Sequence, residues 1–193
     1  MTAITGFAAM TWRHPPPLSG IEGGQLSVTT GAATDFWRET HYGFVHDNGH
    51  FLHHAVTGDF CAEVTVAARY EALYDQAGLM LMLDQNHWIK AGIEFAEGSP
   101  LFSTVLTRDY SDWAVMPLAF PADTIRLRMT RVGDTVQVLV QKPDGIWQMA
   151  RLGYLPPDRS AMVGVMACSP TRAGFDVQFS DYQCRPLPQG NAL

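Results

Sequence analysis

The side chains best suited to bind or transform a ligand are densest between residues 74 and 94. From Trp88 onward, apolar and polar residues alternate, which is typical of a β-strand with one face towards a core. Trp88 would then share a face with Lys90 and Glu94. Aromatic rings beside hydrogen-bonding groups suit the apolar faces and the hydroxyls of a sugar. The candidates in this stretch are Tyr74, Asp75, Gln76, Trp88, Lys90 and Glu94.

Further candidates lie on either side of this stretch. The pattern does not decide whether the two flanking tryptophans fill the core or form the rim of a binding site. Asp35 and Asp112, each close to a tryptophan, suit the capping of backbone amides in turns. The flanking candidates for ligand binding are Trp37, His46, Ser111, Asp112 and Trp113.

Two interpretations of the Lys90 and Glu94 pair compete. In the simpler one they form a solvated ion pair, which contributes about 0–1 kcal/mol to stability. The same strand face also carries aromatic and thioether side chains, including those of Trp88, Met80 and Met82. Because exposed apolar surface of this kind often marks a binding site, the ligand-binding interpretation is favoured.

Catalysis would require a partner for Glu94. Glycosidases use two carboxyl groups about 5–9.5 Å apart, but the strand from Trp88 to Glu94 carries only one. Asp75 or a histidine such as His46 could supply the second titratable group. Five of the seven histidines lie between residues 41 and 54 without the spacing of a metal-ligand motif, so we expect no metal and no cofactor.

Strand patterns recur every 8 to 12 residues or so, with turn residues between them, and no run of ten or more residues has a helical period. Residues 84–87 should join two strands in a hairpin that brings Gln76 towards Glu94. Asp47-Asn48-Gly49 predicts a second hairpin within residues 41–56, and residues 124–131 and 135–141 predict a third. The expected architecture is an all-β sandwich or barrel.

The composition limits the possible partners. The 193 residues suit a single domain with a core at about residues 7–185 and short terminal extensions. The formal net charge of −6, without a basic stretch, argues against nucleic acid. No segment has the roughly 20 apolar residues of a membrane helix. Three widely spaced cysteines suit reduced thiols and a cytoplasmic location.

Five motifs stand out in order along the chain: Thr34-Asp35-Phe36-Trp37, Asp47-Asn48-Gly49-His50, residues 74–79, residues 88–94 and Ser111-Asp112-Trp113. Together they resemble an uncharacterised family that includes the yeast regulator-of-enolase protein. The resemblance covers roughly residues 7–185. It implies a concanavalin A-like jelly roll, a β-sandwich of two antiparallel sheets, in which the concave face commonly holds carbohydrate.

The sequence therefore favours lectin-like binding of a small carbohydrate or polyol on the concave sheet, without chemistry. One alternative is a carbohydrate-active enzyme, a hydrolase or isomerase that uses Glu94 with Asp75 or a histidine. The other, which the resemblance suggests, is a protein-interaction module that regulates a metabolic enzyme.

Overall fold

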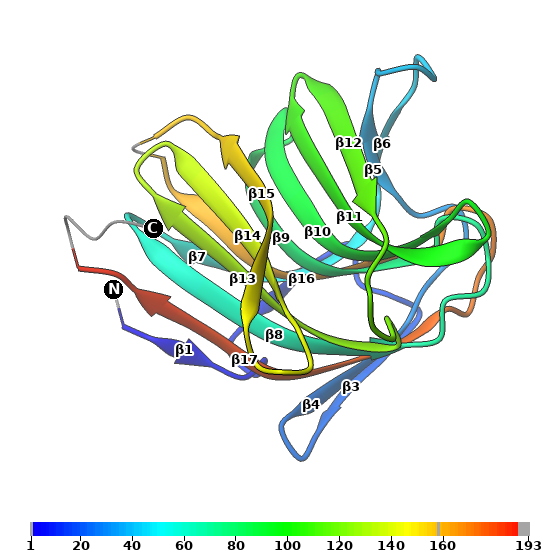
Figure 1. Cartoon of the computed structure of the whole chain (residues 1–193), viewed down its shortest axis with the longest axis horizontal. Helices are drawn as coiled ribbons and strands as arrows, with labels where there is room; N and C mark the ends of the chain where they lie inside the picture. Colours follow the sequence, from blue (N-terminus) through cyan, green and yellow to red (C-terminus); the bar gives the residue numbers. More distant parts are fainter. Residues whose placement is uncertain (1, 158, 189–193) are drawn as a thin grey trace.

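The computed structural model describes residues 2–157 and 159–188, and every regular element among them is a β-strand. The strands form two large antiparallel sheets, packed face to face, and one small sheet (Figure 1). The expected all-β jelly-roll sandwich is confirmed. No helix in the described part of the chain is long and apolar enough to cross a membrane. Most of the expected C-terminal extension lies outside the described residues.

Sheet A has eight strands in the order β15-β14-β13-β8-β17-β4-β3, and β1 also pairs with β17. Their bounds are β1 Ile4–Thr5, β3 Leu18–Glu22, β4 Gln25–Thr29, β8 Phe60–Ala68, β13 Thr124–Val132, β14 Thr135–Gln141, β15 Trp147–Tyr154 and β17 Asp176–Pro186.

Sheet B has seven strands in the order β12-β11-β10-β9-β16-β7-β2, and the small sheet C pairs β5 with β6. The bounds in sheet B are β2 Thr11–Arg13, β7 His50–Val56, β9 Gln76–Asp84, β10 His87–Ala96, β11 Ser99–Arg108, β12 Tyr110–Met116 and β16 Ala161–Cys168. Sheet C consists of β5 Phe36–Arg38 and β6 Val45–Asp47.

Sheet B is covered on both faces. Its inner face packs on sheet A, with Leu79, Ile89 and Ile93 in the main hydrophobic core. Because side chains alternate along a strand, the neighbouring residues point to the outer face. There, with Phe36 and Trp37 of sheet C, they form a second, smaller cluster, whose other members are Phe51, Met80, Met82, Trp88, Val105, Met166 and Cys168. The centre of sheet B is therefore a buried layer between two cores.

The hairpin of β9 and β10 has the predicted register, with Gln76 paired to Glu94. Its turn is shorter than expected, because Asp84 pairs with His87 and only residues 85 and 86 remain between the strands. The hairpin of β13 and β14 is also confirmed.

The hairpin predicted within residues 41–56 is wrong. Strand β6 pairs with β5, whereas β7 pairs with β2 and β16. Asp47-Asn48-Gly49 instead carries the chain from sheet C to sheet B, and the amides of Asn48 and Gly49 donate to the Asp35 carbonyl at 3.1 and 3.0 Å. The turn residues are real signals, but they do not specify which strands pair.

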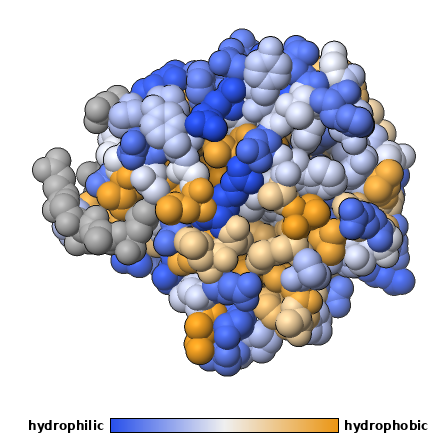
Figure 2. Space-filling view, turned by 45° about the horizontal axis from the view of Figure 1, so that its top comes forward, coloured by the Kyte–Doolittle hydropathy of each residue, from blue (hydrophilic) through white to orange (hydrophobic). Residues whose placement is uncertain are grey.

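On the face of the molecule that Figure 2 shows, apolar side chains lie in patches that hydrophilic side chains interrupt. One exposed group belongs to the edge strand β15 and the turn before it, where Ile146, Met149, Leu152 and Tyr154 are 46–59% exposed. Another surrounds the pocket described next.

Candidate ligand-binding pocket

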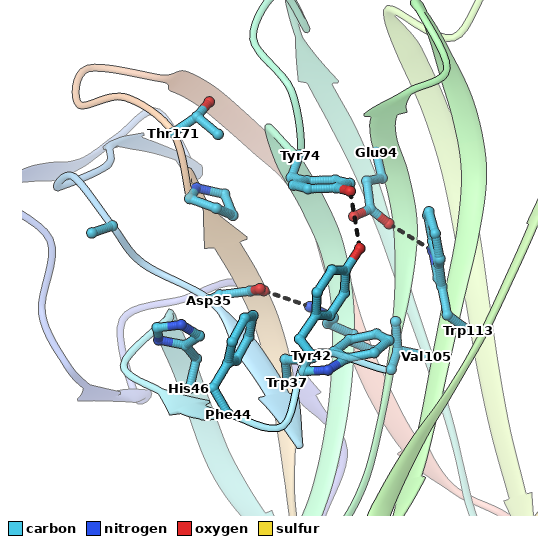
Figure 3. A pocket seen from close by; sticks show the side chains of 13 residues that line it. Asp35, Trp37, Tyr42, Phe44, His46, Tyr74, Glu94, Val105, Trp113 and Thr171 are labelled. Atoms are coloured by element: carbon cyan, nitrogen blue, oxygen red, sulfur yellow. Dashed lines mark hydrogen bonds and ion pairs between the residues drawn. The ribbon is translucent and has the colours of Figure 1, made fainter. Parts of the chain in front are cut away.

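A pocket of about 310 Å³ lies on the outer face of sheet B, where segment 33–46 folds over β10 and β11 (Figure 3). Strand alternation places Lys90 and Glu94 on this face, while the loop around sheet C supplies aromatic rings. The lining residues are Ala33, Asp35, Trp37, Tyr42, Phe44, His46, Tyr74, Lys90, Glu94, Val105, Trp113, Pro170 and Thr171.

A buried ion pair joins the loop to the sheet. Lys90 Nζ lies 2.9 Å from Asp35 Oδ1, and the side chains are 4% and 18% exposed. Burial alone would lower the pKa of Lys90, but the combined effects of Asp35, Cys168 and Glu94 outweigh burial, and the pKa lies above its ordinary value. The same Asp35 oxygen accepts hydrogen bonds from the Phe36 amide and Gln76 Nε2. Lys90 is thus a fixed cation in the pocket.

Glu94 is 6% exposed and is held through a single oxygen. Its Oε2 accepts hydrogen bonds from Ser103 Oγ at 2.5 Å and from Trp113 Nε1 at 3.0 Å. Burial raises the pKa of Glu94, and the opposing effects of Lys90 and the Ser103 hydroxyl do not cancel the shift. Glu94 therefore accepts a proton more readily than an ordinary glutamate.

Two tyrosines approach one another from separate segments. Tyr42 OH and Tyr74 OH lie 3.3 Å apart, and the two hydroxyl groups point towards one another (Figure 3). This hydrogen bond, together with burial, raises the pKa of Tyr74 to about 12. Trp37 donates to the Thr40 carbonyl at 3.0 Å, which fixes its ring against Tyr42 in an edge contact. The aromatic walls are therefore ordered by polar contacts at their edges.

The structure brings six of the predicted ligand-binding residues together in the pocket lining: Trp37, His46, Tyr74, Lys90, Glu94 and Trp113. The two tryptophans differ. Trp37 is 8% exposed and also belongs to the second core, whereas Trp113 is 36% exposed. Gln76 lies behind the lining as a donor to Asp35. Trp88 is 2% exposed within the second core and does not line the pocket.

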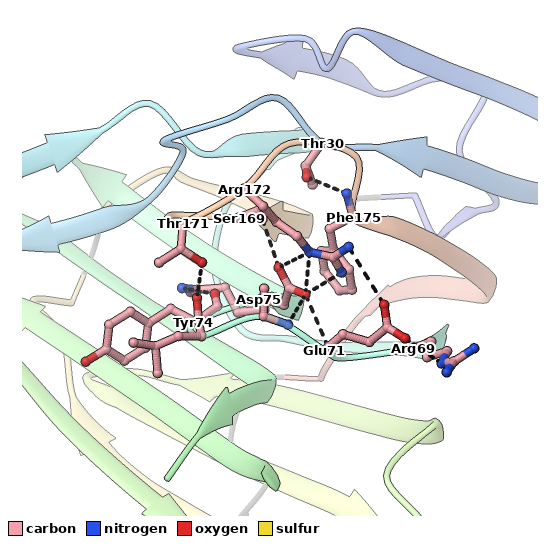
Figure 4. A network of polar contacts seen from close by, with 12 residues as sticks. Thr30, Arg69, Glu71, Tyr74, Asp75, Ser169, Thr171, Arg172 and Phe175 are labelled. Atoms are coloured by element: carbon pink, nitrogen blue, oxygen red, sulfur yellow. Dashed lines mark hydrogen bonds and ion pairs between the residues drawn. The ribbon is translucent and has the colours of Figure 1, made fainter. Parts of the chain in front are cut away.

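Asp75, proposed as a ligand or catalytic partner, lies in a separate polar network (Figure 4). Arg172 Nη2 lies 2.5 Å from Asp75 Oδ2, Ser169 Oγ donates to Oδ1 at 2.8 Å, and the Ala72 amide donates to Oδ2 at 3.0 Å. Burial opposes the charge, but these donors lower the pKa of Asp75. Asp75 therefore links the segment before β9 to the segment after β16.

Ser111 and Asp112 also lie outside the pocket lining. The Ser111 hydroxyl accepts a hydrogen bond from the Arg38 amide at 2.9 Å, so it anchors β5 to β12. Asp112 forms an ion pair with Arg151 of β15 at 3.0 Å. Both residues hold strands together instead of facing a ligand.

Several lining residues were not among the sequence candidates, chiefly Asp35, Tyr42 and Phe44. Asp35 does cap the Phe36 amide at 2.7 Å, as the turn pattern indicates, but it also binds Lys90. Tyr42 and Phe44 lie in the aromatic stretch before Asp47, and their rings stack with centroids 5.2 Å apart. Among the described residues, no group of three or more His, Cys, Asp or Glu side chains could hold a metal ion.

Fold and pocket together define a β-sandwich protein of the concanavalin A-like jelly-roll class, with a polar and aromatic pocket on the outer face of one sheet. Residues 12–187 match the model of the family described as "Protein of unknown function (DUF1349)". The chain belongs to this family, as its motifs predicted.

Individual relatives agree with this assignment. "Regulation of enolase protein 1" of Saccharomyces cerevisiae is 40% identical over 183 residues, which cover 95% of this chain and 92% of the relative. The crystal structure of a functionally unknown protein from Saccharomyces cerevisiae superimposes with a TM-score of 0.92 and 39% identity, over 96% of this chain and all of that one.

A more distant structure shares the fold alone. The GH43 BlXynB protein from Bacillus licheniformis superimposes with a TM-score of 0.67 and 16% identity, over 86% of this chain and 34% of that one. The sandwich therefore also occurs as one part of a longer protein.

Proposed function

We propose that this protein binds a small carbohydrate or polyol in the pocket on the outer face of sheet B. The observation that carries the proposal is the combination of aromatic walls with the buried Lys90 and Glu94 and the half-buried Asp35 in one cavity of about 310 Å³. Sugars present apolar ring faces and hydroxyl edges, which such a surface complements. The size suits a ligand of one or two sugar rings. The three free, buried cysteines fit a cytoplasmic location.

Calorimetric titration with neutral monosaccharides, disaccharides and polyols tests the proposal. Trp113→Ala should weaken binding of the ligand found by at least about tenfold, because it removes a wall and a donor to Glu94. Tyr110→Ala is the matched control, since Tyr110 lies on the same strand, is 66% exposed and does not line the pocket. Absence of binding across the panel, or equal effects of the two variants, would contradict the proposal.

An enzyme acting on carbohydrate is the second candidate, and the environment of Glu94 favours it. A buried carboxyl group with a raised pKa is typical of a general acid. Asp75 cannot assist from its position in the Arg172 network, but His46 lines the same pocket. Glu94→Gln should then abolish turnover of a bound sugar while binding persists, as product analysis by chromatography would show.

A protein partner is the third candidate, because the name of the yeast relative refers to enolase. Apolar side chains are exposed at or beside the pocket rim, among them Tyr42, Phe44, Leu73 and Trp113 at 36–47%. A stable complex with enolase in analytical ultracentrifugation, lost on Phe44→Ser and unaffected by saturating sugar, would favour this function over sugar binding.

A further inference from the structure

The pocket lining carries more carboxyl groups than lysine or arginine side chains. Among the described residues that line it, Lys90 is the only lysine or arginine, while Asp35 and Glu94 both contribute carboxyl groups. Lys90 forms its hydrogen bond with Asp35. The donors to Glu94 are the Ser103 hydroxyl and the Trp113 indole, which are both neutral. One cation therefore faces two carboxyl groups, and Glu94 shares the charge of Lys90 with Asp35.

The donors to each of these two carboxyl groups converge on one of its oxygens. All three donors to Asp35, from Phe36, Gln76 and Lys90, bind Oδ1. Both donors to Glu94 bind Oε2. Asp35 Oδ2 and Glu94 Oε1 are therefore the oxygens to which a ligand would donate.

The rings around Glu94 add a second source of attraction for a cation. Trp37, Tyr42, Tyr74 and Trp113 all line the cavity. The centroids of the Tyr74 and Trp113 rings lie 6.3 Å apart in an edge contact. The Trp113 indole Nε1 donates a hydrogen bond to Glu94 Oε2. The faces of aromatic rings carry negative potential and bind ammonium groups within about 6 Å of the centroid. Carboxylate and rings thus favour the same kind of ligand group.

We propose that the ligand is an amino sugar or amino polyol whose ammonium group lies between Glu94 and the aromatic walls, while its hydroxyls donate to Asp35. This inference rests on the proposed function and narrows its ligand class. The raised pKa of Glu94 agrees with it, because burial disfavours a lone negative charge there and a bound cation would offset that charge in place of a proton.

Calorimetric titration of three matched sets of probes tests the inference: glucose, galactose and mannose; their 2-amino derivatives; and their N-acetyl derivatives. The N-acetyl group keeps the nitrogen but removes the charge. At least one amino sugar should bind about tenfold or more tightly than its parent and its N-acetyl form, which corresponds to about 1.4 kcal/mol.

Glu94→Gln should remove this preference but retain binding of the parent sugar, because glutamine keeps an acceptor oxygen without the charge. Asp112→Asn is the matched control, since Asp112 is 61% exposed and lies outside the pocket lining, and it should leave the preference unchanged. If Glu94→Gln does not fold, as judged by thermal unfolding, Trp113→Leu and Trp113→Phe replace it. The leucine variant should then lose more of the preference than the phenylalanine variant.

Equal affinities for the three sets would overturn this inference and leave carbohydrate binding intact. Binding by none of the nine sugars, neutral or charged, would overturn it together with the proposed function. An amine preference that survives Glu94→Gln, or that Trp113→Leu leaves unchanged, would also overturn it.

Discussion

Lys90 shows how one side chain can serve both the fold and the pocket. Its ammonium group lies on the outer face of sheet B and reaches a carboxylate on the loop before β5. Taking both charges out of water is costly, and their mutual attraction offsets that cost only while both remain. The pair therefore fixes the loop over the sheet, and with it the aromatic residues that the loop carries.

Lys90→Met should lower the free energy of unfolding by about 3–5 kcal/mol, because it leaves Asp35 without its partner in a largely buried site. Urea unfolding monitored by circular dichroism measures the change. Lys142→Met is the control, since its ion pair with Asp144 is on the surface and its loss should matter far less. Similar losses in both variants would contradict a structural role for the buried pair.

The raised pKa of Glu94 predicts how the free energy of unfolding depends on pH, and the sign is opposite to that expected for most paired carboxylates. Because its pKa in the folded protein lies above the value in the unfolded chain, the protonated form stabilises the fold. This contribution is fully present below about pH 4.3 and is lost as the pH rises through the folded pKa.

The unfolding free energy of the wild type should thus fall, relative to that of Glu94→Gln, as the pH rises from about 4 towards 8. Glutamine does not titrate, so the variant lacks the pH-dependent contribution of Glu94 to the free energy of unfolding. Urea unfolding of both proteins across this range measures the difference, and parallel pH profiles would show that burial does not shift the Glu94 pKa.

At the scale of elements, segment 33–49 completes the pocket. It includes sheet C and packs Phe36 and Trp37 into the second core. Gly49 marks its tightest contact, because a Cβ there would overlap the Phe36 ring and the Cys168 sulfur. The close approach of this segment to sheet B therefore depends on a residue without a side chain.

Gly49→Ala should lower the unfolding free energy by about 1–3 kcal/mol through overpacking and should weaken ligand binding as the segment shifts. Gly20→Ala on the edge strand β3 is a matched control, since no atom lies within 4 Å of a Cβ at that position. Chemical unfolding and calorimetry report the two effects. Equal stability of the two variants would mean that the segment accommodates the methyl group freely.

The sequence predicted the β9–β10 hairpin well, because alternation and turn residues are local signals that determine register. The same alternation predicted that Lys90 and Glu94 share one face of the strand. It did not predict the pairing of β6 with β5, or that Asp35 reaches Lys90 across 55 residues of chain. Such contacts depend on how loops fold over a sheet, and no local pattern specifies that. Asp75 and Asp112 looked equally suitable, but distant arginines bind both.

For the molecule as a whole, sheet B lies between two hydrophobic cores, so its central strands should be better protected from amide hydrogen exchange than strands at the edges of sheet A. Strands β9, β10 and β16 are buried over nearly their whole length, whereas β3 is exposed throughout and β15 carries no fully buried residue. Amide hydrogen exchange should therefore be slowest in those three central strands and fastest in β3 and β15. Mass spectrometry of exchanged peptides checks this, and equal protection across the two sheets would contradict it.

The tryptophans around the pocket allow ligand binding to be followed by intrinsic fluorescence. Trp37 and Trp113 line the cavity and Trp88 lies in the cluster beneath it, whereas Trp12 and Trp147 belong to strands away from the pocket. Trp113 is the most exposed of the three, so a ligand that displaces water from its ring should shift the emission to shorter wavelength. Occupancy could then be followed in real time without a label, and Trp113→Phe would remove most of the signal.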